Sequence, residues 1–366
     1  MRFVFVSYNY SEDIYSPEEW LNRLKIYVGS LECLSKMHTV MRVEQINYKG
    51  NFWHNGVRYY CAGHGKKKNY FPAKLNAFVK SLRPDVVIVS GLYFPLQVIQ
   101  LRLRLGKKVK IIAQNHGEKP FTGIKKYLQR VADKCVDAYF FTSYDSGAEW
   151  VAKGNLASEK KIHEIMEVSS VFHPVDKIFA RSKTQTGGDP VFLWAGRLNK
   201  NKDPLTVVNA FVKFLQFQPT AHLYMIYQTA ELLPELQLLI NTGNENCKAV
   251  TLVGTMAHQE MQYWFSSADF IISGSHHEGS GTAICEAMSC GCVPVVTDIP
   301  SFRFMTANGE CGLLCKAGNE NALLDALMQT IEMNIEEKRK RTLEHFKNVL
   351  SFEAISRRIQ EVVSSL

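Results

Sequence analysis

The residues best suited to chemistry lie within positions 275–300, which read SHHEGSGTAICEAMSCGCVPVVTDIP. An acidic, glycine-rich loop comes first and consists of Glu278, Gly279, Ser280, Gly281 and Thr282. Its glycines allow the backbone to approach a ligand closely and to adopt a positive φ. Helix formers follow, and we expect Thr282 to cap that helix while its first N–H groups stay free. Such a helix start binds anions, a diphosphate among them.

Two carboxylates, Glu278 and Glu286, accompany this loop. Carboxylates are poor partners for phosphate, but they accept hydrogen bonds from hydroxyl groups. Glu286 lies four residues after Thr282, so both share one helix face about one turn apart. Phosphate and polyhydroxyl recognition together indicate a sugar nucleotide. The plainer alternative is one acidic residue near a helix start and one solvated glutamate.

Two cations lie earlier in the chain. Arg197 and Lys202 bracket a turn between the apolar run 191–195 and a helix that Asp203-Pro204 begins as N-cap and first residue. The arginine fork and the lysine point charge would neutralise a diphosphate. Ordinary surface charge around a turn is the alternative.

A histidine, His116, follows another predicted strand, 109–113, in the loop Gln114 to Glu118. A loop at that end of a parallel strand can reach a ligand in the crevice. A histidine beside a glycine is also a common plain loop residue, and both interpretations stay open.

These loops require parallel strands to position them. Apolar runs at 3–6, 86–89, 109–113 and 138–141 alternate with helical patterns, and a second series of runs occupies 191–195, 222–227, 250–253, 270–272 and 293–296. Such alternation predicts parallel α/β sheets, whose ligands bind at the carboxyl ends of strands. Between the first two runs, residues 38–61 predict strands and a hairpin that turns at Asn55-Gly56.

The length of 366 residues fits two domains. We expect an N-terminal domain over 1–180, a polar, glycine-rich linker over 181–189 and a second domain over 190–345. The nine cysteines form no CxxC pair, which favours a reducing, cytoplasmic setting over a metal or disulfide role. The N-terminus reads as a strand and not a signal peptide, and the apolar run 86–101 is too interrupted to span a membrane.

Charge is uneven along the chain. Residues 1–180 hold 27 Lys and Arg against 16 Asp and Glu, a net of +11, whereas residues 181–366 hold 16 against 19, a net of −3. The basic clusters are Lys66, Lys67 and Lys68, then Arg102, Arg104, Lys107, Lys108 and Lys110, then Lys125, Lys126 and Arg130. Such a face could meet an anionic membrane surface or an anionic acceptor, or be solvated. No motif supports nucleic acid.

Residues 190–320 resemble the retaining glycosyltransferases of family four, also called glycosyl transferases group 1. The hallmark Glu-x7-Glu stands as Glu278 and Glu286 and continues as AMSCGCVPVV. The family's Gly-Arg-Leu…Lys-Asp-Pro segment stands as residues 196–198 and 202–204, and its Ala-Asp pair as residues 268–269. The resemblance implies the α/β GT-B fold, two Rossmann-like parallel-sheet domains facing across a cleft. The C-terminal helix, 346–366, is expected to pack back on the N-terminal domain.

The resemblance also implies roles. Arg197 and Lys202, with backbone N–H groups of Gly281 and Thr282, would bind the donor diphosphate. Glu286 would hold the ribose, and Gly279 and Ser280 would contact the sugar or shape the loop. Glu278 and His116 would contact the transferred sugar as catalytic residues. Since there is no Asp-x-Asp, no metal and no further cofactor are expected.

The sequence therefore predicts a retaining, metal-independent glycosyltransferase that uses a nucleotide-sugar donor and a glycan, lipid-linked or small acceptor, in surface polysaccharide biosynthesis. Such an enzyme is expected in the cytoplasm, including the inner face of the membrane. Two alternatives stay open: a non-catalytic sugar-nucleotide-binding protein, and a nucleotide-sugar epimerase of the same fold. Product analysis without an acceptor would identify an epimerase.

Overall fold

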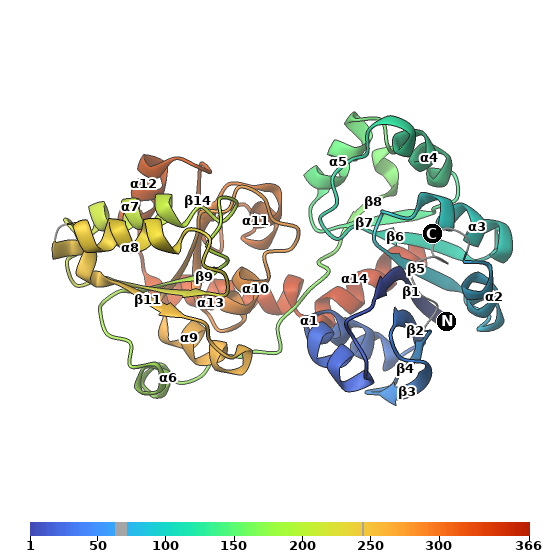
Figure 1. Cartoon of the computed structure of the whole chain (residues 1–366), viewed down its shortest axis with the longest axis horizontal. Coiled ribbons are helices and arrows are strands. Elements are labelled where there is room, and N and C mark those ends of the chain that lie inside the picture. Colours follow the sequence, from blue (N-terminus) through green and yellow to red (C-terminus); the bar gives the residue numbers. More distant parts are fainter. Residues whose placement is uncertain (63–71, 244) are drawn as a thin grey trace. The chain divides into compact units, whose positions relative to one another are not determined.

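A computed structural model covers the chain and describes residues 1–62, 72–243 and 245–366. Lys66, Lys67 and Lys68, predicted as part of the basic face, lie outside the described residues. The chain forms two compact units (Figure 1). Unit 1 comprises Met1–Ser169 and Phe352–Leu366, and unit 2 comprises Ser170–Ser351.

Unit 1 is built on a sheet with strand order β3-β4-β2-β1-β5-β6-β7-β8. Its strands are β1 (Arg2–Ser11), β2 (Thr39–Ile46), β3 (Gly50–His54), β4 (Val57–Cys61), β5 (Val86–Ser90), β6 (Lys110–Gln114), β7 (Ala138–Phe141) and β8 (Ile162–Glu164). Neighbouring strands pair in parallel, except for the β3–β4 hairpin. The predicted turn at Asn55-Gly56 is confirmed: both residues have positive φ, 45° and 81°, as a tight hairpin requires.

The helices of unit 1 connect these strands. They are α1 (Pro17–Ser35), α2 (Ala73–Ser81), α3 (Pro95–Leu105), α4 (Gly123–Asp133), α5 (Tyr144–Ala152), the short η2 (Glu159–Lys161) and α14 (Phe352–Ser365). Ser16 caps α1 by accepting from the Glu19 N–H, a common role for serine. The sheet core is aliphatic and aromatic, with Val4, Val87, Ile111 and Tyr139 buried.

Unit 2 has a parallel sheet in the order β11-β10-β9-β12-β13-β14. Its strands are β9 (Val191–Gly196), β10 (His222–Tyr227), β11 (Val250–Gly254), β12 (Phe270–Ser273), β13 (Val293–Thr297) and β14 (Leu313–Cys315). Its helical segments are α6 (Lys177–Thr184), α7 (Pro204–Phe214), α8 (Leu233–Thr242), η3 (Glu245–Ala249), η4 (His258–Glu260), α9 (Met261–Ser267), α10 (Thr282–Ser289), α11 (Pro300–Met305), α12 (Glu320–Gln329), α13 (Ile335–His345) and η5 (Phe346–Leu350).

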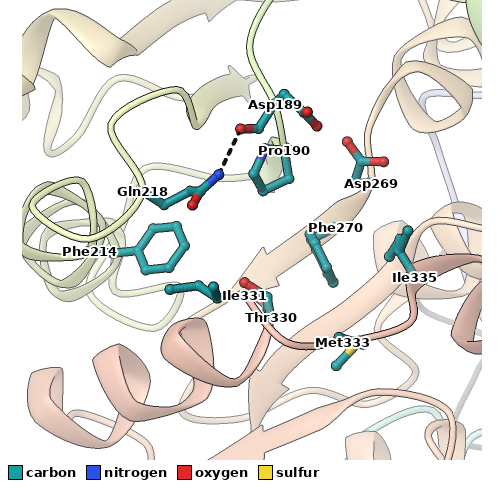
Figure 2. A pocket seen from close by; sticks show the side chains of 10 residues that line it. All are labelled: Asp189, Pro190, Phe214, Gln218, Asp269, Phe270, Thr330, Ile331, Met333 and Ile335. Atoms are coloured by element: carbon teal, nitrogen blue, oxygen red, sulfur yellow. Dashed lines mark hydrogen bonds between the residues drawn. The ribbon is translucent and has the colours of Figure 1, made fainter.

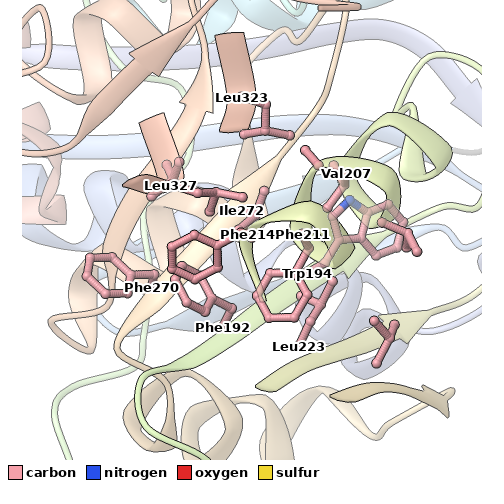
Figure 3. Packing of buried hydrophobic residues seen from close by; sticks show 14 of the residues in the cluster. Phe192, Trp194, Val207, Phe211, Phe214, Leu223, Phe270, Ile272, Leu323 and Leu327 are labelled. Atoms are coloured by element: carbon pink, nitrogen blue, oxygen red, sulfur yellow. The ribbon is translucent and has the colours of Figure 1, made fainter. Parts of the chain in front are cut away.

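Aromatic packing anchors the strands that carry the unit 2 loops. Phe192 of β9 stacks on Phe270 of β12 with ring centroids 5.0 Å apart, and Phe211 and Phe214 of α7 meet its edges (Figure 3). Leu327 of α12 packs into the same cluster. Burying such side chains stabilises the fold by about 1.5–3 kcal/mol each, which fixes the strands whose far ends hold the loops.

The boundary between the units differs from the predicted one. Residues 181–184 belong to α6, which Asp176 caps, and not to an irregular linker over 181–189. Lys177 and Arg181 of this helix both pair with the buried Asp269, so the segment belongs to unit 2. The glycine-rich composition of 187–188 concealed a helix whose partners lie far along the chain.

The C-terminal helix packs on unit 1, as expected from the resemblance. α14 lies against α1, where the Phe352 ring occupies the place that a side chain on Gly29 would need, 2.6 Å from its Cβ position. The helix does not span 346–366, because Phe346–Leu350 continues α13 in unit 2. Among the described helices, none is long and apolar enough to cross a bilayer.

Candidate functional site

Two strand-end loops of unit 2 are joined to each other. The turn 197–203 follows β9, and the loop 274–281 follows β12, its neighbour in the sheet. The His276 N–H donates to the Asn201 carbonyl at 2.8 Å, and Asn201 Nδ2 donates to the His277 carbonyl at 3.0 Å. Gly274 permits this approach, because a Cβ there would lie 2.9 Å from the Asp203 carbonyl oxygen.

The joined loops pair the predicted cation with the predicted carboxylate. Lys202 Nζ donates to Glu278 Oε1, and the two side chains are 24% and 13% exposed. The Lys202 ammonium thus provides a counter-charge to a carboxylate that is largely sheltered from water. Arg197 lies at the start of the same turn and is exposed; no described residue accepts a hydrogen bond from its guanidinium.

The start of α10 differs from the predicted cap. Gly281 is the N-cap in a left-handed conformation (φ 54°), and Thr282 is the first helical residue, so the expectation that Thr282 caps the helix is wrong. A Cβ on Gly281 would lie 2.7 Å from the Phe302 ring, so the site demands glycine. Within the described chain, the N–H groups of Thr282 and Ala283 have no acceptor, as expected for a first helical turn and suited to an anion.

Glu286 lies one turn into α10 and is 5% exposed, which contradicts the alternative of a solvated glutamate. Its Oε1 is 2.6 Å from His258 Nε2, in η4 after β11. Phe172 packs against the imidazole with ring centroids 4.8 Å apart. Sequence reasoning missed His258, although its place just after a predicted strand was a usable signal. Its Nδ1 is buried with no partner among the described residues.

The flanking loop residues take distinct places. Ser280 is 9% exposed and Gly279 is partly exposed, so the loop between Glu278 and α10 is drawn inward. Six of the predicted site residues therefore come together at the strand ends of unit 2: Lys202, Glu278, Gly279, Ser280, Gly281 and Thr282. Among the described residues, no group of three His, Cys, Asp or Glu could hold a metal ion.

His116 belongs to unit 1, where it has neighbours of its own. Its Nδ1 pairs with the Glu167 carboxylate, and its side chain is 31% exposed. Burial opposes charge on the imidazole, but the Glu167 carboxylate outweighs it and raises the pKa of His116 above the ordinary 6.5. The Tyr27 ring meets the imidazole edge-on at 6.4 Å.

Glu118 fixes the backbone of the His116 loop. Its carboxylate accepts from the His116 N–H at 2.6 Å and from the Leu92 N–H at 3.0 Å, which ties the loops after β6 and β5 together. Neither Glu118 nor Glu167 was predicted. Glu167 lies 51 residues after His116, and only the strand order brings it near.

A cavity of about 210 Å³ lies at the amino ends of β9 and β12, opposite the carboxyl ends that carry the loops above (Figure 2). Pro190 and Phe270 precede or begin strands there, and Gln218 Nε2 donates to the Asp189 carbonyl at 3.2 Å. The one carboxylate facing it with a buried side chain, Asp269, is satisfied by Lys177, Arg181 and the Val191 N–H. This cavity is therefore separate from the Lys202 and Glu278 loops.

The fold and the strand-end loops define a class, the GT-B proteins, with two α/β units of Rossmann type. A glycosyltransferase from Rickettsia africae superposes with a TM-score of 0.73 at 16% identity, covering 100% of this chain and 98% of that one. Anabaena HepE, solved with UDP and glucose, superposes with a TM-score of 0.69 at 15% identity over 100% of both chains. These similarities show the fold.

Residues 176–348 match the family model for glycosyl transferases group 1. The matched region, just under half of the chain, contains the motifs around Glu278 and Glu286 that predict this family. It is 27% identical over 176 residues to a D-inositol 3-phosphate glycosyltransferase of Stackebrandtia nassauensis, covering 43% of this chain and 37% of the relative.

Two further relatives bear the names of mannosyltransferases. The lipopolysaccharide core biosynthesis mannosyltransferase LpsB of Rhizobium meliloti is 25% identical, covering 63% of this chain and 64% of the relative. A GDP-mannose:cellobiosyl-diphosphopolyprenol alpha-mannosyltransferase of Xanthomonas campestris is 34% identical, covering 21% and 20%. The chain thus spans less than two thirds of the length of these curated relatives.

Proposed function

We propose that the protein is a retaining, metal-independent glycosyltransferase that moves a sugar from a nucleoside-diphosphate sugar to an acceptor. One observation carries the proposal: Lys202 and Glu278 meet beside the unpaired N–H groups of Thr282 and Ala283. A cation and free amides suit a diphosphate, and a carboxylate suits sugar hydroxyls. The family match of residues 176–348 supports the same activity.

The charges in this site fit the reaction. Breaking the glycosyl–phosphate bond builds negative charge on the leaving diphosphate and positive charge on the anomeric carbon. Lys202, Arg197 and the first N–H groups of α10 would stabilise the diphosphate without rearranging during the reaction. Because these groups supply positive charge themselves, we propose that no metal ion is required.

The two glutamates would divide the recognition of the donor. Glu286, held by His258 Nε2, retains a second carboxylate oxygen that can accept hydrogen bonds from ribose hydroxyls. Glu278 would contact the transferred sugar, and the diphosphate would compete with it for Lys202. His116 of unit 1 would donate from Nε2 to a sugar oxygen, because its Nδ1 is engaged by Glu167.

The acceptor is proposed as a glycan, a lipid-linked glycan or a small molecule, in surface polysaccharide synthesis at the cytoplasmic face of a membrane. The support is the naming of one relative as a lipopolysaccharide core mannosyltransferase and of another as acting on a diphosphopolyprenol. A cytoplasmic place agrees with nine cysteines that are all free thiols.

A nucleotide panel tests the donor site first. Melting temperature is measured with UDP, GDP, ADP and CMP; a site ligand at a hundredfold excess over its Kd should stabilise by about 2.7 kcal/mol. Arg197→Ala should abolish the shift, whereas Arg341→Ala, which breaks a surface pair with Glu337, should keep it. No shift with any nucleotide would overturn the donor site.

Transfer is tested with the donor sugar whose nucleotide binds. Release of nucleoside diphosphate and an acceptor product of unchanged anomeric configuration are expected, with equal rates before and after chelator treatment. An inverted product or loss of activity on chelation would contradict retention or metal independence. Donor binding without turnover across an acceptor panel would identify a non-catalytic binding protein.

A further inference from the structure

Helix α4 of unit 1, labelled in Figure 1, buries two polar side chains beside Ala132 and exposes three apolar ones. Its buried face carries Gln129 and Asp133, which are 2% and 3% exposed. Its solvent face carries Ile124, Tyr127 and Val131, which are 82%, 72% and 51% exposed. These three positions are spaced i, i+3 and i+7, so they form one stripe along the helix.

The buried Asp133 of this face has partners within unit 1. Asp133 accepts from the Ala157 N–H at 3.2 Å and pairs with Lys161, whose Nζ also donates to the Asp133 carbonyl at 2.6 Å. These contacts hold Asp133 on the buried side of the helix, which leaves the apolar stripe facing solvent. An apolar stripe left in water on a helix that is otherwise well anchored indicates a surface that another body covers.

The surroundings of the stripe are of one charge. Residues 100–135 contain ten Lys and Arg against two Asp and Glu, and both acidic residues, Glu118 and Asp133, are buried. Lys125 Nζ lies over the Phe121 and Tyr93 rings, 4.8 and 5.6 Å from their centroids, and Arg130 and Lys134 are exposed on or next to α4. Helix α3, which packs against α4, adds Leu103, 81% exposed.

We propose that this face of unit 1, the α4 stripe with its basic surround, docks on an anionic lipid bilayer. The side chains of Ile124, Tyr127 and Val131 would enter the boundary between headgroups and acyl chains, and the lysines and arginines would meet lipid phosphates. Cations near such a surface are attracted by its negative potential. An apolar stripe inside a basic rim is the pattern of a helix that lies in the interface plane.

Charge decides between a bilayer and a second copy of the chain. Two copies that met through this face would bring like charges together, with no exposed carboxylate in residues 100–135 to compensate. A bilayer rich in anionic lipid offers opposite charge and an apolar layer over the same surface. The inference goes beyond the proposed catalytic function and does not rest on it, because binding needs no substrate.

Vesicle sedimentation of the full chain tests the inference. Vesicles of phosphatidylcholine alone are compared with vesicles that also contain phosphatidylglycerol, at low and high salt. We expect binding to the anionic vesicles only, weakening as salt rises. The triple variant Ile124→Ser, Tyr127→Ser and Val131→Ser should bind about tenfold or more weakly, since its apolar contact with the bilayer is lost.

A matched variant controls for general loss of surface hydrophobicity. Ile178→Ser with Leu238→Ser removes two exposed apolar side chains from unit 2, 81% and 64% exposed, and should bind vesicles like the original chain. Melting temperatures of all variants verify folding. Absence of binding to anionic vesicles by the folded original chain, or undiminished binding by the triple variant, would overturn the proposal. The proposal would also be overturned if the original chain formed a concentration-dependent oligomer and the triple variant stayed monomeric, since a second copy would then cover the stripe.

Discussion

The strand-end loops of the two units are built in different ways. In unit 2 the backbone contributes glycines at positive φ, free N–H groups and hydrogen-bonded loops, beside the side-chain pairs Lys202–Glu278 and His258–Glu286. In unit 1 the chemistry depends on side chains that meet across the sheet, His116 with Glu167, and Glu118 with the Leu92 N–H. A loop whose backbone forms the site can be recognised from a short stretch of sequence, whereas a pair of side chains from distant strands cannot.

The largest effect should come from removing the cation of unit 2. Lys202→Ala leaves Glu278 without its partner and the leaving diphosphate without a charge, so kcat/KM should fall by about 10²–10³. Steady-state kinetics with the donor that binds measures it. Lys213→Ala, which breaks the exposed pair with Glu320, is the control and should act like the original chain. Equal, small losses in both variants would remove Lys202 from the site.

Backbone dependence is tested by two glycines at helix starts with similar positive φ. Gly281→Ala in unit 2 combines a φ of 54° with a Cβ 2.7 Å from Phe302, whereas Gly123→Ala in unit 1 combines a φ of 60° with open space. Left-handed backbone alone costs an alanine about 1–2 kcal/mol, so Gly123→Ala should lose that and Gly281→Ala clearly more. Denaturant unfolding followed by circular dichroism measures both free energies of unfolding. Equal decreases in the two variants would mean that the Phe302 ring moves aside without cost.

The pair His258 and Glu286 should show a smaller, coupled effect. Glu286→Gln and His258→Ala should each weaken nucleotide binding by about tenfold, because a hydrogen bond to a charged group is worth roughly 1.5–3 kcal/mol. The double variant should lose less than the product of the two, since both act through one carboxylate. Calorimetric titration measures the cycle. Additive losses would show that His258 contacts the nucleotide independently.

The smallest effect concerns protonation in unit 1. Glu167→Gln should lower the pKa of His116, which NMR titration of the imidazole reports directly. Because the folded-state pKa is raised above 6.5, the pair's stabilisation is fully present below that pH and is lost as the pH rises through the raised value. The variant should lose this pH dependence of stability. An unmoved pKa would show that Glu167 does not set the charge of His116.

The contrast between the units also sets what could be predicted from sequence. The alternation of runs gave both parallel sheets, and the spacing of Arg197, Lys202, Glu278 and Glu286 placed them at strand ends of unit 2. Thr282 was assigned the cap because threonine is a good N-cap, yet Gly281 takes the position by virtue of its backbone freedom. Local propensity therefore predicts the start of this helix to within one residue, but it predicts the wrong residue as the cap.

Other residues could not be predicted, because their roles arise from long-range pairing. Glu167 and His258 find His116 and Glu286 only once the strands are ordered, 51 and 28 positions apart. Residues 181–189 are polar and glycine-rich and so predict a linker, whereas residues 181–184 belong to helix α6, whose Lys177 and Arg181 pair with the distant Asp269. Strands β8 and β14, three residues each, are too short to show a pattern.

The return of α14 to unit 1 makes unit 2 an insertion within unit 1. The chain leaves unit 1 after Ser169 and re-enters it at Phe352, so two peptide connections link the units. During synthesis, unit 2 has its whole sequence before unit 1 does, because the α1 face that includes Gly29 waits for Phe352. Residues 1–169 made alone would expose that face, whereas residues 170–351 form a continuous segment that can be excised whole. The order of completion is therefore the reverse of the order in which the units begin.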